Sequence, residues 1–365
     1  MTNINLRRLA TTVAVMATAT LGLGVLATPA DAAGPTARLK QGTVTVTGTA
    51  VRDVLDISMN HDQLTVDFGS DGTIDAHFSM SRVQRLSVQL GAGDDGTAVI
   101  GTGVSDVPIA ISGGAGNDGS GVLSTEDQSL AKDAPVTIVG NDGNDSLGAT
   151  VTGPATVDAG AGDDRVDGGG RGVGPETISL GDGNDKFVAT LDPFLTDISE
   201  TVDGGTGQDT LETRGTFASE GVNLSADAGH LIVTHNAFDK IDADNVEDVT
   251  WTGFGGNDEG GGGDVVAVND LTGTDVVRFT PDFTDPLDNT GPNNSADQLT
   301  VRGTAGVDRI TVSGSGANIT VSGLTPLVTP VNLDSQDVLQ IDTLAGNDTV
   351  DTRGLQRGLV QLLVL

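Results

Sequence analysis

Apolar and polar residues alternate in short runs along most of the chain, and Gly, Asp and Pro separate the runs. Glu176–Leu180 leads into a Gly-rich turn, and Lys186–Thr190 follows that turn. Alternation of this kind, rich in β-branched residues, predicts strands, whereas no sustained helical period follows the N-terminal segment. We therefore predict an all-β chain whose unit is a strand, an acidic Gly turn, a second strand and a variable bend. Stacking of such units predicts parallel sheets.

The acidic Gly turns recur at a nearly constant spacing. The last aspartates of six strong copies are 23, 27, 19, 21 and 24 residues apart. Weaker copies end at Asp258 and Asp348. A period of this length over many copies is typical of a solenoid. The six strong copies end at Asp95, Asp118, Asp145, Asp164, Asp185 and Asp209.

A second, longer repeat lies on both sides of this array. Each of its three copies starts with a Gly-Thr pair followed by an acidic residue, and 47, 43 or 45 residues separate the Gly from the aspartate that ends the copy. We interpret the acidic residues Asp53, Glu220 and Asp308 as bend residues rather than ligands. The predicted organisation is one elongated β architecture with an N-terminal β repeat at 33–90, a turn-rich solenoid at 91–209 and further β repeats at 210–365.

The first 32 residues have the zones of a signal peptide. Arg7 and Arg8 precede an apolar stretch from Leu9 to Ala27, and small residues follow up to Ala32. A transmembrane anchor is the weaker interpretation, because threonines interrupt the stretch and no second apolar span exists. We expect a secreted, extracellular protein without a membrane span.

Charge and composition narrow the classes of partner and chemistry. The chain has 18 basic and 51 acidic residues, a net charge of −33, which disfavours nucleic acid and anionic membranes as partners. It has 53 glycines, one tryptophan and no tyrosine or cysteine. Disulfides, Cys-ligated zinc and thiol catalysis are therefore excluded.

The turns offer only hard oxygen donors. Glycine allows close backbone approach, so its carbonyl oxygens can join the aspartate carboxylate around one ion. Such donors suit calcium, which takes six to eight oxygens, and one turn cannot supply them all. In register, carboxylates about 4.8 Å apart repel by about 0.9 kcal/mol even in water, and an ion between coils removes that repulsion. The alternative is a set of solvated bends, since Asp, Asn and Gly favour turns anyway.

The turns resemble the nonapeptide repeats of RTX, or haemolysin-type, calcium-binding proteins. Ser112–Asp118 and Val202–Asp209 match the G-G-x-G-x-D core. The resemblance implies a parallel β-roll with calcium between turns, held by the final aspartates of the six strong copies and by turn glycines. The implied metal ligands are Asp95, Asp118, Asp145, Asp164, Asp185 and Asp209, with Gly93, Gly114, Gly116, Gly143, Gly160, Gly162, Gly181, Gly183, Gly205 and Gly207.

The chain differs from the family in two respects, and the first of them changes the arrangement of calcium ions that we expect. A standard coil has about 18 residues and a calcium turn on both sides, whereas these coils are longer and carry the motif once. We therefore expect a single ion column along one edge. The export signal is N-terminal, and the flanking Gly-Thr repeats look like those of secreted calcium-binding proteins of actinobacteria.

The sequence gives little indication of catalytic chemistry. The chain lacks G-x-S-x-G and H-E-x-x-H, and a repeated carboxylate ladder does not supply the contrasting environments of an acid/base pair. We interpret Trp251 as core filler and the histidines as surface or loop residues. The four histidines are His61, His77, His230 and His235.

The function that the sequence favours is a secreted, non-enzymatic calcium-binding solenoid with a structural or adhesion role. A cell-surface or polysaccharide partner is expected but not identified. The alternative is an extracellular polysaccharide-active enzyme, a lyase or epimerase, built on a calcium-binding β-helix. A basic catalytic cluster would favour it, but Arg165, Arg171, Lys186 and Arg214 are scattered in the sequence.

Overall fold

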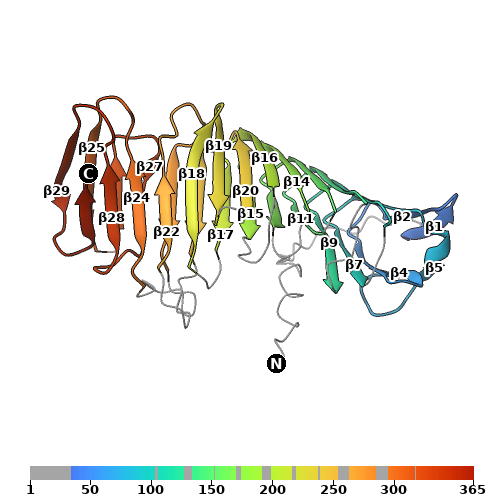
Figure 1. Ribbon diagram of the computed structural model, residues 1–365. Coiled ribbons are helices and arrows are strands. Elements are labelled where there is room, and N and C mark those ends of the chain that lie inside the picture. The colour runs from blue at the N-terminus through green and yellow to red at the C-terminus, as the bar shows by residue number, and fades with distance from the viewer. Residues whose placement is uncertain are drawn as a thin grey trace, which may run out of the picture.

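Among the residues that it describes, the computed structural model has 30 β-strands and one short 3-10 helix, η2 (Met80–Arg82), in an elongated stack (Figure 1). It describes residues 34–365 except 103–105, 127–133, 152, 170–173, 191–198, 216–218, 237–238, 254–262, 285–294 and 317. The predicted signal peptide, Arg171 and Asp258 lie outside the described residues. Within the described part, no helix has the length and apolar character needed to cross a bilayer.

Two 15-stranded sheets, mostly parallel, make up the fold, and we call them sheet A and sheet B. In spatial order, sheet A contains β1 (Thr36–Lys40), β2 (Thr43–Thr47), β6 (Arg85–Ala92), β8 (Ile109–Ala115), β10 (Val136–Asp142), β12 (Ala155–Ala161), β14 (Glu176–Gly183), β16 (Ser199–Gly207), β20 (Asp239–Asp244), β19 (His230–His235), β18 (Gly221–Asp227), β22 (Val265–Val268), β24 (Gln298–Arg302), β28 (Val338–Asp342) and β30 (Gln361–Val364). Sheet B contains β29 (Thr349–Leu355), β25 (Arg309–Ser315), β26 (Asn318–Ser322), β27 (Leu327–Val328), β23 (Arg278–Asp282), β21 (Asp248–Thr252), β17 (Thr210–Arg214), β15 (Lys186–Thr190), β13 (Arg165–Gly169), β11 (Ser146–Thr150), β9 (Gly119–Glu126), β7 (Gly96–Thr102), β3 (Val54–Met59), β4 (Gln63–Phe68) and β5 (Ala76–Ser79).

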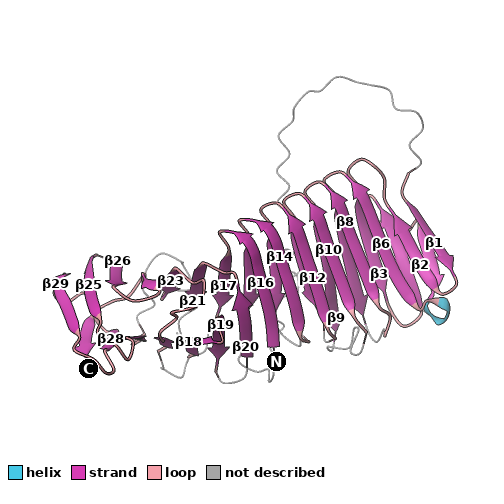
Figure 2. Cartoon of the chain, turned by 90° about the horizontal axis from the view of Figure 1, so that it is seen from above, coloured by secondary structure: helices cyan, strands magenta, loops and turns pink. Residues whose placement is uncertain are grey.

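From β6 to β17 the chain alternates between the sheets, one strand in each per coil, and consecutive coils stack side by side (Figure 2). Neighbouring coils pair in parallel register, so that Ile111, Ile138, Val157, Ile178 and Val202 form one row. All five side chains are buried, because every second residue of each strand faces the other sheet. The predicted all-β class, the predicted order of strand and turn, and the parallel pairing are confirmed here.

The longer repeat contains antiparallel strands, which the predicted parallel stacking did not include. In each copy a hairpin is inserted into the stack: β4 pairs antiparallel with β3, β19 with β18, and β26 with β25. The first and third copies place the hairpin in sheet B, whereas the second places it in sheet A. The second copy therefore begins half a coil out of phase, and its acidic residue, Glu220, lies at the other edge of the stack from Asp53 and Asp308.

The two edges differ chemically. At the A-to-B edge, where the chain leaves sheet A for sheet B, the regular coils carry the acidic Gly turns. At the B-to-A edge, the first or second residue of a sheet A strand donates its N–H to a proline carbonyl of the next coil. Because proline has no N–H, it can stand just before a strand without removing a hydrogen bond of the sheet. The acceptors are Pro108, Pro135, Pro154 and Pro175.

Aliphatic residues dominate the core between the sheets, and large aromatic side chains enter in the C-terminal half. Trp251 is fully buried in β21, and its ring meets Phe283 edge-on with centroids 5.4 Å apart. Its interpretation as core filler is confirmed.

Candidate functional site

Each of the six predicted aspartate ligands stands immediately before a sheet B strand. The aspartate and the second residue of the strand are two positions apart, so their side chains lie on the same face of the strand. Asp118 and Ser120, for example, both face the interior. Burial is nearly complete, from 4% exposed at Asp95 to 0% at Asp209. The structure thus brings residues about one coil apart in sequence into one buried column at the A-to-B edge.

Hydrogen bonds join this column from coil to coil. The N–H of Asp118 donates to Oδ1 of Asp145 at 2.7 Å, and the N–H of Ser146 donates back to the carbonyl oxygen of Asp118 at 2.8 Å. The same carboxylate-to-amide bond repeats at 2.6–2.8 Å along the whole column. Its members are Asp53, Asp95, Asp118, Asp145, Asp164, Asp185, Asp209 and Glu247.

A second ladder runs one residue earlier in the turns, on the exposed side. Here the later coil donates to the earlier one: the N–H of Asn117 bonds Asp94 Oδ1 at 3.0 Å, and the N–H of Asn144 bonds Asn117 Oδ1 at 2.8 Å. The ladder continues through Asp163, Asn184 and Gln208. Sequence reasoning missed it, although an Asn or Asp before the final aspartate of five of the six strong turns was a usable signal.

One carboxylate oxygen of each predicted ligand is left without a hydrogen-bond partner. Oδ1 accepts the neighbouring N–H, whereas Oδ2 is buried and accepts no hydrogen bond. A buried carboxylate oxygen in this state is costly unless a cation or a proton satisfies it. The six residues with this bare Oδ2 are Asp95, Asp118, Asp145, Asp164, Asp185 and Asp209.

In the Gly-Thr turns, donors of the turn itself satisfy the second oxygen of the carboxylate. Thr49 donates its backbone N–H and its hydroxyl to Asp53 Oδ2 at 2.5 and 2.9 Å. Thr304 donates its backbone N–H to Asp308 Oδ2 at 2.8 Å and its hydroxyl to Asp308 Oδ1 at 2.9 Å. These contacts agree with the interpretation of Asp53 and Asp308 as bend residues.

Burial raises the pKa of the bare carboxyls, and the carboxylates of neighbouring coils raise it further. The pKa of Asp118, Asp145 and Asp209 rises to about 6, and that of Asp164 to about 7. The amide of the adjacent coil opposes this shift by donating to the ionised form. Without a cation, ionisation of these carboxyls near neutral pH therefore costs more free energy than ionisation of an aspartate in water.

The predicted glycine ligands line the same edge, and coil stacking alone already requires some of them. Gly143 has a φ of 136°, and a Cβ there would lie 2.0 Å from the carbonyl oxygen of Gly116 in the preceding coil. The turn carbonyls therefore point along the stack toward the next coil. Among the described residues, no three Asp, Glu or His side chains gather into a metal centre. An ion at this edge needs main-chain oxygens as well as carboxylates.

Asp348, a weaker candidate, is half-buried, and its Oδ1 accepts the N–H of Asp308 at 2.9 Å. It extends a short acidic stack at the same edge near the C-terminus.

The histidine prediction was wrong at one position. His235 is buried rather than at the surface, with Nε2 3.6 Å from Oε1 of the buried Glu220. The reason is the hairpin, whose strand β19 directs this side chain toward the entry of β18. His230 is exposed, as predicted, and its Nδ1 lies 2.9 Å from Asp242 Oδ1.

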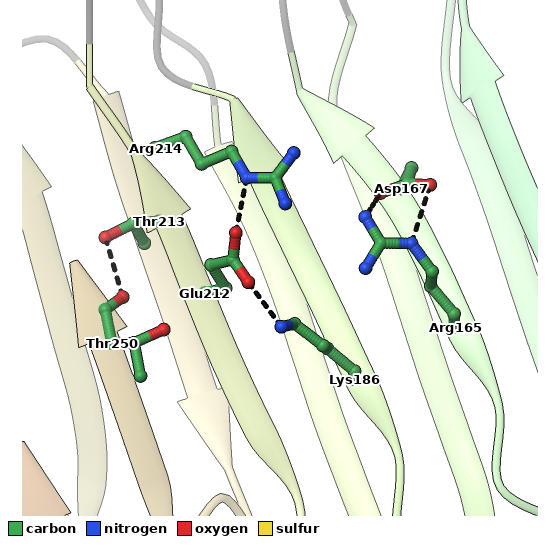
Figure 3. A network of polar contacts seen from close by, with 7 residues as sticks. All are labelled: Arg165, Asp167, Lys186, Glu212, Thr213, Arg214 and Thr250. Carbon is green, nitrogen blue, oxygen red and sulfur yellow. Dashed lines mark hydrogen bonds and ion pairs between the residues drawn. The ribbon is translucent and has the colours of Figure 1, made fainter. Parts of the chain in front are cut away.

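Two basic residues that are separated in the sequence meet on the outer face of sheet B (Figure 3). Lys186 and Arg214 both contact Glu212, while Arg165 bonds Asp167 in its own strand. Burial would raise the pKa of Glu212, but the hydrogen bonds from Lys186 and Arg214 hold it below its usual value. These cations are thus less scattered than the sequence suggested, and carboxylates engage them.

Comparison of the chain with protein-family models, with curated proteins and with solved structures found no match.

Proposed function

We propose that this chain is a secreted calcium-binding β-solenoid, an RTX-like β-roll, in which calcium ions join consecutive coils at the A-to-B edge. The observation that carries the proposal is the column of six buried aspartates, each with one oxygen bonded to the next coil and the other bare. The aspartates supply the charged ligands, and oxygens of the Gly-rich turns complete the shell.

Calcium fits this donor set better than other ions. All the donors are oxygens, which calcium accepts in flexible geometry at about 2.3–2.6 Å, whereas zinc prefers nitrogen and sulfur. The column also contains no cationic side chain of its own. A divalent ion shared by two coils satisfies a bare Oδ2, reduces repulsion along the column and adds binding energy to coil stacking.

The proposed role is structural, at the cell surface or in an extracellular matrix, and without catalysis. The signal-peptide pattern of residues 1–32 supports an extracellular protein, which calcium would stiffen. A cell-surface or polysaccharide partner remains part of this proposal. The outer face of sheet B does not favour the enzyme alternative, because Glu212 and Asp167 engage its basic residues.

The test compares two aspartates of the same column by thermal melting and circular dichroism, with calcium or with chelator. Asp164→Asn keeps an oxygen for the Asp145 N–H but removes the bare charge, so it should abolish much of the calcium-induced rise in melting temperature. Asp53→Asn should leave that rise intact, because Thr49 already satisfies its Oδ2. A wild-type spectrum and melting temperature that do not respond to calcium would contradict the proposal.

A further inference from the structure

A separate acidic column lies at the B-to-A edge of the C-terminal half. It consists of residues that precede the parallel sheet A strands β18, β22, β24 and β28, and their backbone N–H groups donate to the next carboxylate at 3.0, 2.7 and 2.9 Å. All four side chains are buried. The 19–27-residue spacing does not mark it in the sequence, and of its members only Asp264 follows a run of glycines, Gly260 to Gly263. Its members are Glu220, Asp264, Asp297 and Asp337.

Asp264 carries a bare oxygen in this column. Its Oδ1 accepts the N–H of Glu220, whereas its Oδ2 is buried and accepts no hydrogen bond; the residue is 1% exposed. Asp337 differs, because its Oδ1 accepts the N–H of Asp297 and its Oδ2 accepts the N–H of Asp334 at 2.5 Å. The carboxylate of Asp264 is therefore chemically incomplete, whereas that of Asp337 is satisfied.

The charges around Asp264 favour a cation there. Burial first, and then the carboxylates of Asp297 and Glu220, raise the pKa of Asp264 to about 7, whereas the hydrogen bond from the Glu220 N–H and the charge of His235 act against them. His235 itself lies 3.6 Å from Glu220. The carboxylates of the neighbouring coils thus concentrate negative charge around Asp264.

A glycine, Gly253, lies directly beside the bare oxygen and the indole of Trp251. A Cβ on Gly253 would lie 2.6 Å from Asp264 Oδ2 and 2.3 Å from Cη2 of Trp251. Any larger residue at this position would press on the carboxylate and on the indole. The bare oxygen and the only tryptophan of the chain are therefore close neighbours.

We propose that Asp264 forms a second cation site, at the B-to-A edge, which takes a hard divalent cation of the calcium class between the coils of β18, β22 and β24. This site goes beyond the proposed function, because it lies on the other edge of the stack from the six predicted aspartate ligands. Its occupancy does not depend on that of the first column.

Terbium luminescence sensitised by Trp251 tests the site on the full mature chain. Terbium replaces calcium at oxygen sites and emits when a nearby indole is excited, and this chain has one tryptophan and no tyrosine. The wild type should show sensitised emission that excess calcium removes. No sensitised emission, or emission that calcium does not displace, overturns the proposal.

Matched variants assign the signal. Asp264→Asn keeps an oxygen for the Glu220 N–H and should lose the sensitised emission, with unchanged circular dichroism and unchanged calcium uptake at the first column. Asp164→Asn should keep the emission and lose calcium at the first column instead.

Asp258→Asn controls for terbium bound by the segment between Trp251 and Asp264. Emission that survives Asp264→Asn, or that Asp258→Asn removes, contradicts the site. Asp337→Asn, at a fully bonded carboxylate, should keep the emission even if it lowers stability.

Discussion

Two kinds of turn enter the same buried column, and they differ in how they treat its carboxylate. In the Gly-Thr turn, Thr49 donates its N–H and its hydroxyl to Asp53. In the Gly-x-Gly turns the residue at that place is usually a glycine with positive φ, such as Gly160 at 112°, and Asp164 keeps a bare Oδ2. The number of local donors, rather than the number of acidic residues, separates a self-contained bend from a binding turn.

Calcium removal should produce the largest difference between the two kinds of turn. An ion at about 100 times its Kd adds about 2.7 kcal/mol per site. Hydrogen exchange with excess chelator should therefore lose protection in the coils from β8 to β17. The coil that follows Asp308 should retain its protection, because Thr304 satisfies that carboxylate. Equal loss of protection in both regions would contradict the distinction between the Gly-x-Gly turns and the Gly-Thr turns.

Glycine replacement in the stacked turns comes next in size. Gly143→Ala places a methyl group 2.0 Å from the Gly116 oxygen, whereas Gly273, also at positive φ, has open space around its Cβ position. Gly273→Ala should cost about 1–2 kcal/mol from backbone strain alone. Gly143→Ala should add about 1–3 kcal/mol for overpacking. Equal costs in denaturant unfolding would mean that coil contact does not constrain Gly143.

The pH dependence of the calcium-free chain should be smaller and should have a defined sign. The pKa values of Asp118 and Asp164 are raised to about 6 and 7 in the folded chain, against about 3.9 for an unfolded aspartate. Between these values the folded state binds more protons, so its stability decreases as pH rises. Melting temperatures in chelator should fall from pH 5 to pH 7.5, and calcium should weaken or reverse the trend. A rise in chelator would contradict the raised pKa values.

The smallest effect should come from the ion pairs on the outer face of sheet B. Glu212→Gln removes the carboxylate shared by Lys186 and Arg214 (Figure 3). Partly exposed pairs contribute about 1 kcal/mol or less. Calcium binding should not change, which makes this variant a charge-matched control for Asp164→Asn. A large fall in calcium uptake would link this face to the column.

Much of the regular stack could be predicted from sequence. Period-two alternation identified β14 and β15, and the repeated Gly-Asp turns identified the A-to-B edge of coils 91–209. Alternation carries no strand direction, however, so the antiparallel β4, β19 and β26 were missed. The half-coil phase of the second long repeat also has no local signal, and it moves Glu220 to the other edge.

The candidate site was predictable in its residues but not in their environment. The spacing identified Asp164 and its equivalents, yet whether Oδ2 is bonded depends on a donor four residues earlier. Thr49 and Thr304 were visible as the Gly-Thr pairs, but their role required the turn geometry. Asp264 had no regularly spaced repeat of its own, and His235 appeared as a surface residue because its partner Glu220 precedes a different strand, β18.

Calorimetric titration of calcium at pH 6 to 6.5, in two buffers that differ in ionisation enthalpy, tests directly whether the bare oxygens take up calcium. Asp118, Asp145 and Asp209 have pKa values of about 6, so they are partly protonated there. Calcium must displace those protons, since its ligands are ionised carboxylates. We expect calcium binding with an apparent heat that differs between the buffers, and a smaller proton release at pH 8. No binding, or binding without proton release at pH 6 to 6.5, would contradict the role of the column.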